Sequence, residues 1–180
     1  MKSLYIILTL SLLAAGVAVN AETKIIRDAQ GRIVCTVTTD GSRTTYRDAQ
    51  GRITATAANH GGSTTTYRDA QGRIIGTQTT YGSGSSFRDA QGRITATASN
   101  HGGSTTTYRD AQGRIIGTQT THGSGTTYRD AQGRTVATST GSGANTTYRD
   151  AQGRIVGTAT QSGGGTTYRD AQGRVKGTKR

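Results

Sequence analysis

Most ionisable side chains in this sequence belong to one motif, Arg-Asp-Ala-Gln-Gly-Arg, which occurs eight times. Its copies begin at Arg27, Arg47, Arg68, Arg88, Arg109, Arg129, Arg149 and Arg169. Catalysis by a nucleophile and its base, or by paired carboxylates, requires a unique cluster of side chains. Here the aspartates form a series, and no Ser or Thr is distinguished from its many neighbours. The pattern therefore predicts a protein that is not an enzyme and that uses no cofactor.

Metal binding is also not expected from this sequence. The motif aspartates are typical turn formers, and the Gly-Gly-x-Gly-x-Asp pattern of calcium-binding β-rolls is absent. The three histidines, His60, His101 and His122, stand beside glycines in loop-like segments, which favours solvated side chains. Cys35 is the only cysteine, so no intramolecular disulfide is available.

The arginines are the residues most suited to binding. The chain carries 22 Lys and Arg against 10 Asp and Glu, a formal net charge of +12, and most of the positive charge is arginine in two regular columns. If half of these arginines pair with the turn aspartates, the others remain as a periodic cationic stripe suited to phosphate, sulfate or carboxylate polymers. The alternative is that the net charge only keeps a Thr-rich sheet edge soluble. The candidate anion-binding residues are Arg47, Arg68, Arg88, Arg109, Arg129, Arg149 and Arg169.

The spacing of the motif predicts a repeat architecture. Successive copies start 20 or 21 residues apart, and residues 51–84 recur at 92–125 with two substitutions, which indicates duplication of a two-repeat block. Beyond residue 21 the only large aliphatic or non-tyrosine aromatic residues are fifteen Ile or Val and Phe87. So few apolar residues exclude a sizeable core, and backbone ladders, Tyr packing or assembly must stabilise the fold.

Each repeat reads as two strands and two turns. Thr-Thr-Tyr-Arg before the motif and the Ile- and Thr-rich stretch after it favour extended backbone. Asp-Ala-Gln-Gly suits a type I turn closed by a left-handed glycine, in a three-residue hairpin loop with a bulge. The second connection is rich in Gly and Ser. The predicted fold is therefore all-β, a β-hairpin meander or β-solenoid of eight repeats.

Strict alternation along the predicted hairpin sorts its residues onto two faces. One face would carry Tyr108, Asp110, Arg114, Ile116 and Thr118, and the other Thr107, Arg109, Ile115 and Gly117. The first face would gain an aliphatic residue in five repeats, at Val34, Ile75, Ile116, Val136 and Val156. Its aromatic positions, Ile26, Tyr46, Tyr67, Phe87, Tyr108, Tyr128, Tyr148 and Tyr168, would form a row and a thin core.

The segment Asp-Ala-Gln-Gly-Arg-Ile resembles the YD repeats of the Rhs family, which have Tyr-Asp, two residues, then Gly-Arg-Leu at about this period. In the third copy the matching residues are Asp69, Gly72, Arg73 and Ile74. Arg68 stands where the family has its tyrosine, and Tyr67 lies one residue earlier, on what should be the opposite face. The resemblance implies β-hairpin sheets of the kind that build shells around toxin domains, although eight repeats are too few for such a shell.

Residues 1–21 have the pattern of a signal peptide. Met1 and Lys2 start the segment, residues 4–19 are mostly apolar, and Val19-Asn20-Ala21 provides small residues for cleavage. The apolar stretch is marginal for a membrane anchor, which needs about 20 residues. We therefore predict a signal peptide, residues 1–21, followed by a repeat region, residues 22–180, without a stable membrane span after cleavage. The protein would be secreted, periplasmic or at the cell surface.

Two functions follow as hypotheses. The first is an exported, non-enzymatic repeat protein with a structural, surface-interaction or self-assembling role, whose open sheet edges pair with further copies of the chain. The alternative is a soluble binding module that grips an acidic polysaccharide, lipopolysaccharide or nucleic acid through its arginine stripe. Neither hypothesis involves a small-molecule substrate.

Overall fold

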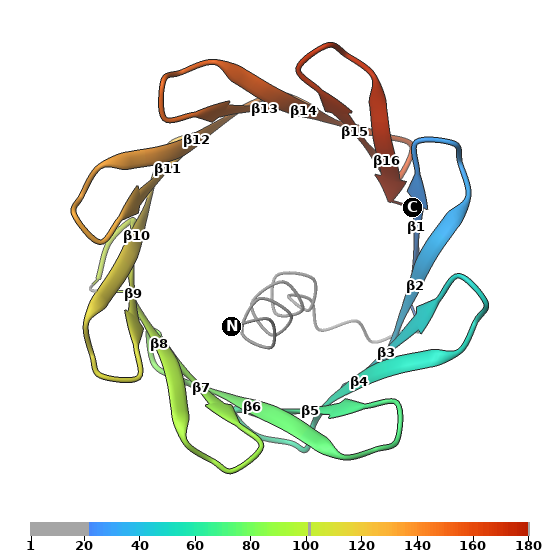
Figure 1. Cartoon of the computed structure of the whole chain (residues 1–180), viewed down its shortest axis with the longest axis vertical. Helices are drawn as coiled ribbons and strands as arrows, with labels where there is room; N and C mark the ends of the chain where they lie inside the picture. Colours follow the sequence, from blue (N-terminus) through green and yellow to red (C-terminus); the bar gives the residue numbers. More distant parts are fainter. Residues whose placement is uncertain (1–21, 101, 180) are drawn as a thin grey trace.

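The structure is a computed structural model that describes residues 22–100 and 102–179, and over these residues the chain is all-β, as predicted. The predicted signal peptide lies outside the described residues. Sixteen strands form eight hairpins, and each strand pairs antiparallel with its neighbours around a closed barrel (Figure 1). The strands are β1 Glu22–Asp28, β2 Ile33–Asp40, β3 Arg43–Asp48, β4 Ile53–Asn59, β5 Thr64–Asp69, β6 Ile74–Tyr81, β7 Gly84–Asp89, β8 Ile94–Asn100, β9 Thr105–Asp110, β10 Ile115–His122, β11 Gly125–Asp130, β12 Thr135–Ser142, β13 Asn145–Asp150, β14 Ile155–Ser162, β15 Gly165–Asp170 and β16 Val175–Lys179.

Each Asp-Ala-Gln-Gly segment forms the predicted turn. In the fifth copy the Asp110 amide donates to the Arg114 carbonyl at 2.9 Å, and the Gly113 amide donates to the Asp110 carbonyl at 3.0 Å. Gly113 has a φ of 78°, a left-handed conformation that costs glycine little because it has no Cβ. The same two hydrogen bonds recur in all eight copies. The three-residue hairpin loop with a bulge is therefore confirmed.

A second bulge, which the sequence did not indicate, follows each turn. The register between β9 and β10 shifts between Ile115 and Gly117, so Ile116 is an extra residue in its strand. As a result Tyr108 pairs with Gly117. The predicted faces are therefore wrong beyond Ile115, because one inserted residue moves every later side chain of the strand to the other face. Gly117 shares the face of Tyr108, and Thr118 lies on the opposite face.

The described apolar core lies on the face that carries the aromatic row. Every buried apolar residue belongs to this face, namely Val37, Tyr46, Ala55, Ala57, Tyr67, Phe87, Ala96 and Ala159. Closure into a ring crowds inward-pointing side chains, so we place this face on the inside and call it the inner face; the other is the outer face. The predicted aromatic row is confirmed as a set of equivalent positions on one face. It is buried at Tyr67, which is 1% exposed, and about 40% exposed at Tyr128, Tyr148 and Tyr168.

Every aromatic position faces a small residue across its own hairpin. Tyr67 pairs with Gly76, Phe87 with Ala96, and Ile26 with Cys35, and the other five repeats have Gly or Ala there. A small cross-strand partner leaves room for a ring to lie across the neighbouring strand. Alternation of large and small residues therefore builds the inner face without many aliphatic side chains.

The predicted contribution of the aliphatic residues to this core is wrong at four of five positions. Val34, Ile116, Val136 and Val156 are 45–51% exposed, and only Ile75 packs against the buried cluster. All five stand at the second bulge, where the ladder is interrupted and the strand bends. The side chain of a residue at this bulge therefore does not point directly at the aromatic row.

One tyrosine of the row has a buried hydroxyl group without an acceptor among the described residues. The Tyr67 hydroxyl donates to Gln78 Oε1 at 2.9 Å. Ala57 occupies the corresponding place beside Tyr46, and among the described residues the Tyr46 hydroxyl oxygen is buried without a hydrogen-bond partner. Burial raises the pKa of Tyr46 to about 12, and neighbouring Tyr67 adds to that shift.

Replacing Tyr46 with phenylalanine should therefore stabilise the protein. The variant removes an unsatisfied buried hydroxyl, and we expect the free energy of unfolding to rise by about 1 kcal/mol. The matched variant Tyr67→Phe removes a satisfied hydroxyl and should lower the same quantity by about 1 kcal/mol. Urea unfolding of both variants measures the difference. Equal losses in the two variants would mean that the Tyr46 hydroxyl has a partner.

Over the described residues the sheet closes on itself, so most of the open edge expected from the sequence is paired. β1 pairs with β16 from Ile26–Asp28 to Gly177–Lys179, and the predicted meander is thus a closed barrel and not an open solenoid. Around the ring the pairing climbs by two residues per repeat: Tyr46 pairs with Ala55, and Ala55 pairs with Asp69, two residues beyond Tyr67. Eight such steps return the pairing to β1.

Candidate polyanion-binding rim

All eight Asp-Ala-Gln-Gly turns lie on one rim of the ring, because an antiparallel meander places alternate turns at the same end. We call this end the motif rim, and in Figure 1 its hairpin loops flare outward. It comprises residues 28–32, 48–52, 69–73, 89–93, 110–114, 130–134, 150–154 and 170–174. The Gly- and Ser-rich turns form the opposite rim. The two arginines of each motif are called the leading and the trailing arginine.

The trailing arginine neutralises the turn aspartate. In the fifth copy Arg114 Nε donates to Asp110 Oδ2 at 2.8 Å, and the backbone amides of Gln112 and Arg114 each donate to Asp110 Oδ1 at 2.9 Å. Arg114 Nη2 also donates to Gln112 Oε1 at 3.3 Å. Partial desolvation raises the pKa of Asp110, but the hydrogen bonds from Arg114 and Gln112 and the Arg114 charge outweigh it and hold the pKa below its usual range. The same ion pair recurs in every copy.

The leading arginine has a different role. Arg109 Nη1 donates to the Gly113 carbonyl at 2.9 Å and so caps the turn of its own hairpin. Its strand position places it on the outer face, opposite Ile115 in its own hairpin and Thr97 in the preceding one. Among the described residues no leading arginine forms an ion pair with an acidic side chain. One donor of the guanidinium is engaged, and the other donors remain available.

The charge of the protein is concentrated on the motif rim. Its sixteen arginines face eight aspartates, which leaves eight positive charges of the formal +12 at one end of the ring. A surface of one sign concentrates oppositely charged ligands and speeds their encounter. The rim therefore combines eight equivalent arginine sites with a long-range attraction for anions.

The structure brings all seven predicted anion-binding residues to this rim. Arg47, Arg68, Arg88, Arg109, Arg129, Arg149 and Arg169 each donate Nη1 to a turn glycine carbonyl. Arg27 makes the same contact with Gly31 at 2.8 Å and was missed, although the first motif copy already marks it. Half of the motif arginines pair with the turn aspartates, which is the condition under which a periodic cationic stripe remains. Anion binding by the leading arginines stays a prediction.

The remaining ionisable side chains form no second cluster in the described ranges. His60 and His122 are exposed next to opposite-rim turns, and His101 lies outside the described residues. No group of three His, Cys, Asp or Glu side chains in residues 22–100 and 102–179 is placed to hold a metal ion. Within the same ranges no helix has the length and apolar character needed to cross a bilayer.

Comparison with known proteins assigns no family. No family model matches the sequence, and no curated protein matches it. Among solved structures, BamB from Moraxella catarrhalis gives a TM-score of 0.44 at 10% identity, over 86% of this chain and 81% of that one. A protein from Arabidopsis thaliana gives 0.36 at 11% identity, over 91% and 86%. TolB from Acinetobacter baumannii gives 0.33 at 13% identity, over 94% and 66%. These scores establish no shared fold, and the resemblance to YD repeats stays a prediction.

Proposed function

We propose that this chain is an exported, non-enzymatic surface-interaction protein whose motif rim binds anionic polymers. The observation that carries the proposal is that the two arginines of each motif have different partners: the trailing arginine pairs with the aspartate, and the leading arginine bonds to a backbone carbonyl. Every turn aspartate is occupied by its trailing arginine, so the charge of the leading arginine is left uncompensated. A guanidinium with free donors matches the geometry of sulfate, phosphate and carboxylate groups.

The ring geometry favours polymers over single anions. A half-exposed arginine that meets one anion in water gains little. Eight equivalent sites on one rim allow a flexible chain of anions to contact several arginines at once, and each further contact then forms at a high effective concentration. Acidic polysaccharide, lipopolysaccharide and nucleic acid all provide such repeated charges. The export of the protein rests on the signal-like residues 1–21.

A structural or self-assembling role through open sheet edges has weaker support. It depended on open strand edges, and the described sheet pairs β1 with β16. Closure pairs Ile26–Asp28 with Gly177–Lys179 and so removes much of the unpaired backbone that invites edge-to-edge pairing along a sheet. The motif rim needs no edge, so the binding role is independent of closure.

Heparin affinity tests the proposal with variants of matched charge. Arg109→Gln with Arg149→Gln removes two leading arginines, and Lys24→Gln with Arg43→Gln removes two cations remote from the motif rim. We expect the first pair to elute at clearly lower salt and to reduce the slope of log affinity against log salt by about one unit per arginine. The second pair should elute close to the parent protein.

Two results would contradict the proposal. If both double variants shift elution equally, retention reflects net charge and not the rim. If the parent protein passes through heparin at low salt, the rim does not bind polyanions at all. Far-UV circular dichroism of each variant checks that the loss of the turn cap has not unfolded the sheet.

A further inference from the structure

Among the described residues, the junction between β1 and β16 is the shortest ladder in the ring. It contains three residue pairs, whereas the other fifteen junctions contain four to six. Residues 22–25 of β1 pair with β2 on one side, and no described residue pairs with them on the other. Over the described residues, this junction therefore has about half the backbone pairing of most internal junctions.

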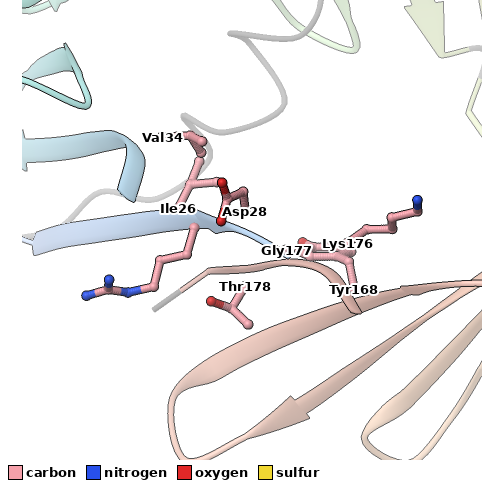
Figure 2. Close-up of a pocket in the computed structure, with 8 residues that line it drawn as sticks. Ile26, Asp28, Val34, Tyr168, Lys176, Gly177 and Thr178 are labelled. Carbon is pink, nitrogen blue, oxygen red and sulfur yellow. The ribbon is translucent and has the colours of Figure 1, made fainter. Parts of the chain in front are cut away.

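The residues that face each other at this junction also differ from those at the internal junctions. Ile26 is the only residue at the aromatic positions that is not aromatic, and it pairs with Lys179. At the other junctions the aromatic residue pairs with Val, Ala, Ser or Gln. Figure 2 shows the hollow at this point, with Ile26 and Val34 above the β1 ribbon and Thr178 below β16. Each of these differences weakens closure relative to an internal junction.

The two edges nevertheless match each other as internal strands do. Asp28 pairs with Gly177 and Arg27 with Thr178. The internal junction of β3 with β2 pairs the equivalent positions in the same register, Asp48 with Cys35 and Arg47 with Thr36. Any β1 edge therefore fits any β16 edge, whether the two belong to one chain or to two.

We propose that the β1–β16 junction is a strand-exchange site at which a second copy of this chain replaces the intramolecular closure. In an exchanged dimer, β1 of each copy pairs with β16 of the other, and two arcs form one larger ring. No residue pair is lost in the exchange, so closure within one chain is favoured only by its high effective concentration. Exchange therefore grows with protein concentration, as in domain swapping.

Cysteine pairs across the junction test the exchange. Asp28 bonds toward β2, so Ile26 and Lys179 form a non-hydrogen-bonded pair, the closer kind in antiparallel sheets and suited to a disulfide. The variant for the β1–β16 junction, called the seam variant, carries Ile26→Cys, Lys179→Cys and Cys35→Ala. Alanine is chosen at position 35 because three other repeats have alanine there. The control variant carries Ser139→Cys, Tyr148→Cys and Cys35→Ala at the equivalent internal junction of β12 with β13.

Oxidation at low protein concentration should give cross-linked monomers in both variants. Oxidation after incubation at high concentration should give covalent dimers in the seam variant alone, because β12 and β13 belong to consecutive hairpins joined by a short turn. A seam disulfide formed at low concentration should also abolish the concentration-dependent dimer that light scattering detects for the Cys35→Ala parent.

Three results would overturn the proposal. The first is a parent that stays monomeric at every concentration. The second is a seam variant that yields only cross-linked monomers at high concentration. The third is a seam variant that still dimerises as the parent does after its disulfide has formed at low concentration, which would place the dimer contact elsewhere. Heparin retention is measured at the motif rim, so its outcome is independent of these results.

Discussion

Replacing Tyr67 with alanine should lower the free energy of unfolding by about 3–5 kcal/mol, the usual cost of deleting a large buried aromatic side chain. Tyr67 is 1% exposed and belongs to the cluster of Val37, Tyr46, Ala55 and Ala57. Because the described chain has so few large apolar residues, few neighbouring side chains can move into the cavity that the substitution leaves. Chemical denaturation followed by circular dichroism measures the loss.

Tyr168→Ala provides the matched control for this prediction. Tyr168 holds the same position in its repeat and faces Gly177 as Tyr67 faces Gly76, but it is 40% exposed. We expect a loss of about 1–2 kcal/mol, in proportion to the smaller buried area. Losses of equal size at the two positions would show that burial on the inner face does not set the stability of the ring.

Acid should unfold the ring through its eight turn aspartates acting together. Each aspartate has a pKa below its usual range, so it stabilises the folded state above the unfolded-state pKa of about 3.9, and this stabilisation is lost as the pH falls through the lower folded-state value. Protonation also leaves all sixteen motif arginines without a counter-charge on one rim. Unfolding free energy should therefore be constant above about pH 5 and fall steeply below about pH 4.

Urea titrations between pH 7 and pH 2, at low and at high salt, measure this effect. Asp110→Asn with Asp150→Asn should lower stability at pH 7 and reduce the pH dependence, because two of the eight titrating groups are gone. Added salt should restore part of the acid loss by screening the arginines from one another. A free energy of unfolding that is unchanged between pH 5 and pH 2 would contradict the role assigned to the turns.

The local structure was predictable because the turn chemistry lies within five consecutive residues. Asp110 as the first residue of the turn, Gly113 in the left-handed region and Arg114 closing the hairpin follow from known turn preferences. The aromatic row followed from the repeat period alone. These features depend on neighbours in the sequence, and the eight copies reinforce one interpretation.

The second bulge and the closure were not predictable for physical reasons. Alternation of residue types assumes an unbroken ladder, and the apolar Ile116 gives no sign that it is an inserted residue. Closure depends on the sum of small bends over sixteen strands, which no single hairpin reveals. The pairing of Asp28 with Gly177 joins residues near the two ends of the described range.

The candidate site was predictable in composition but not in its division of roles. The sequence indicates one arginine on each side of the turn aspartate, and either side chain is long enough to reach it. Backbone direction decides between them: Arg114 shares the aspartate's side of the hairpin, while Arg109 points to the outer face and bonds to the Gly113 carbonyl. Only the folded turn shows which charge is neutralised.

The regular climb of the pairing has a consequence for how such a ring changes in evolution. Each hairpin adds two strands and two residues of stagger, so the ratio of shear to strand number stays constant whatever the copy number, and with it the strand tilt. Duplication of a whole two-repeat block such as 51–91 widens the ring by a fixed increment and leaves the other junctions undisturbed. Relatives with more or fewer motifs should therefore form rings of graded diameter from interchangeable parts.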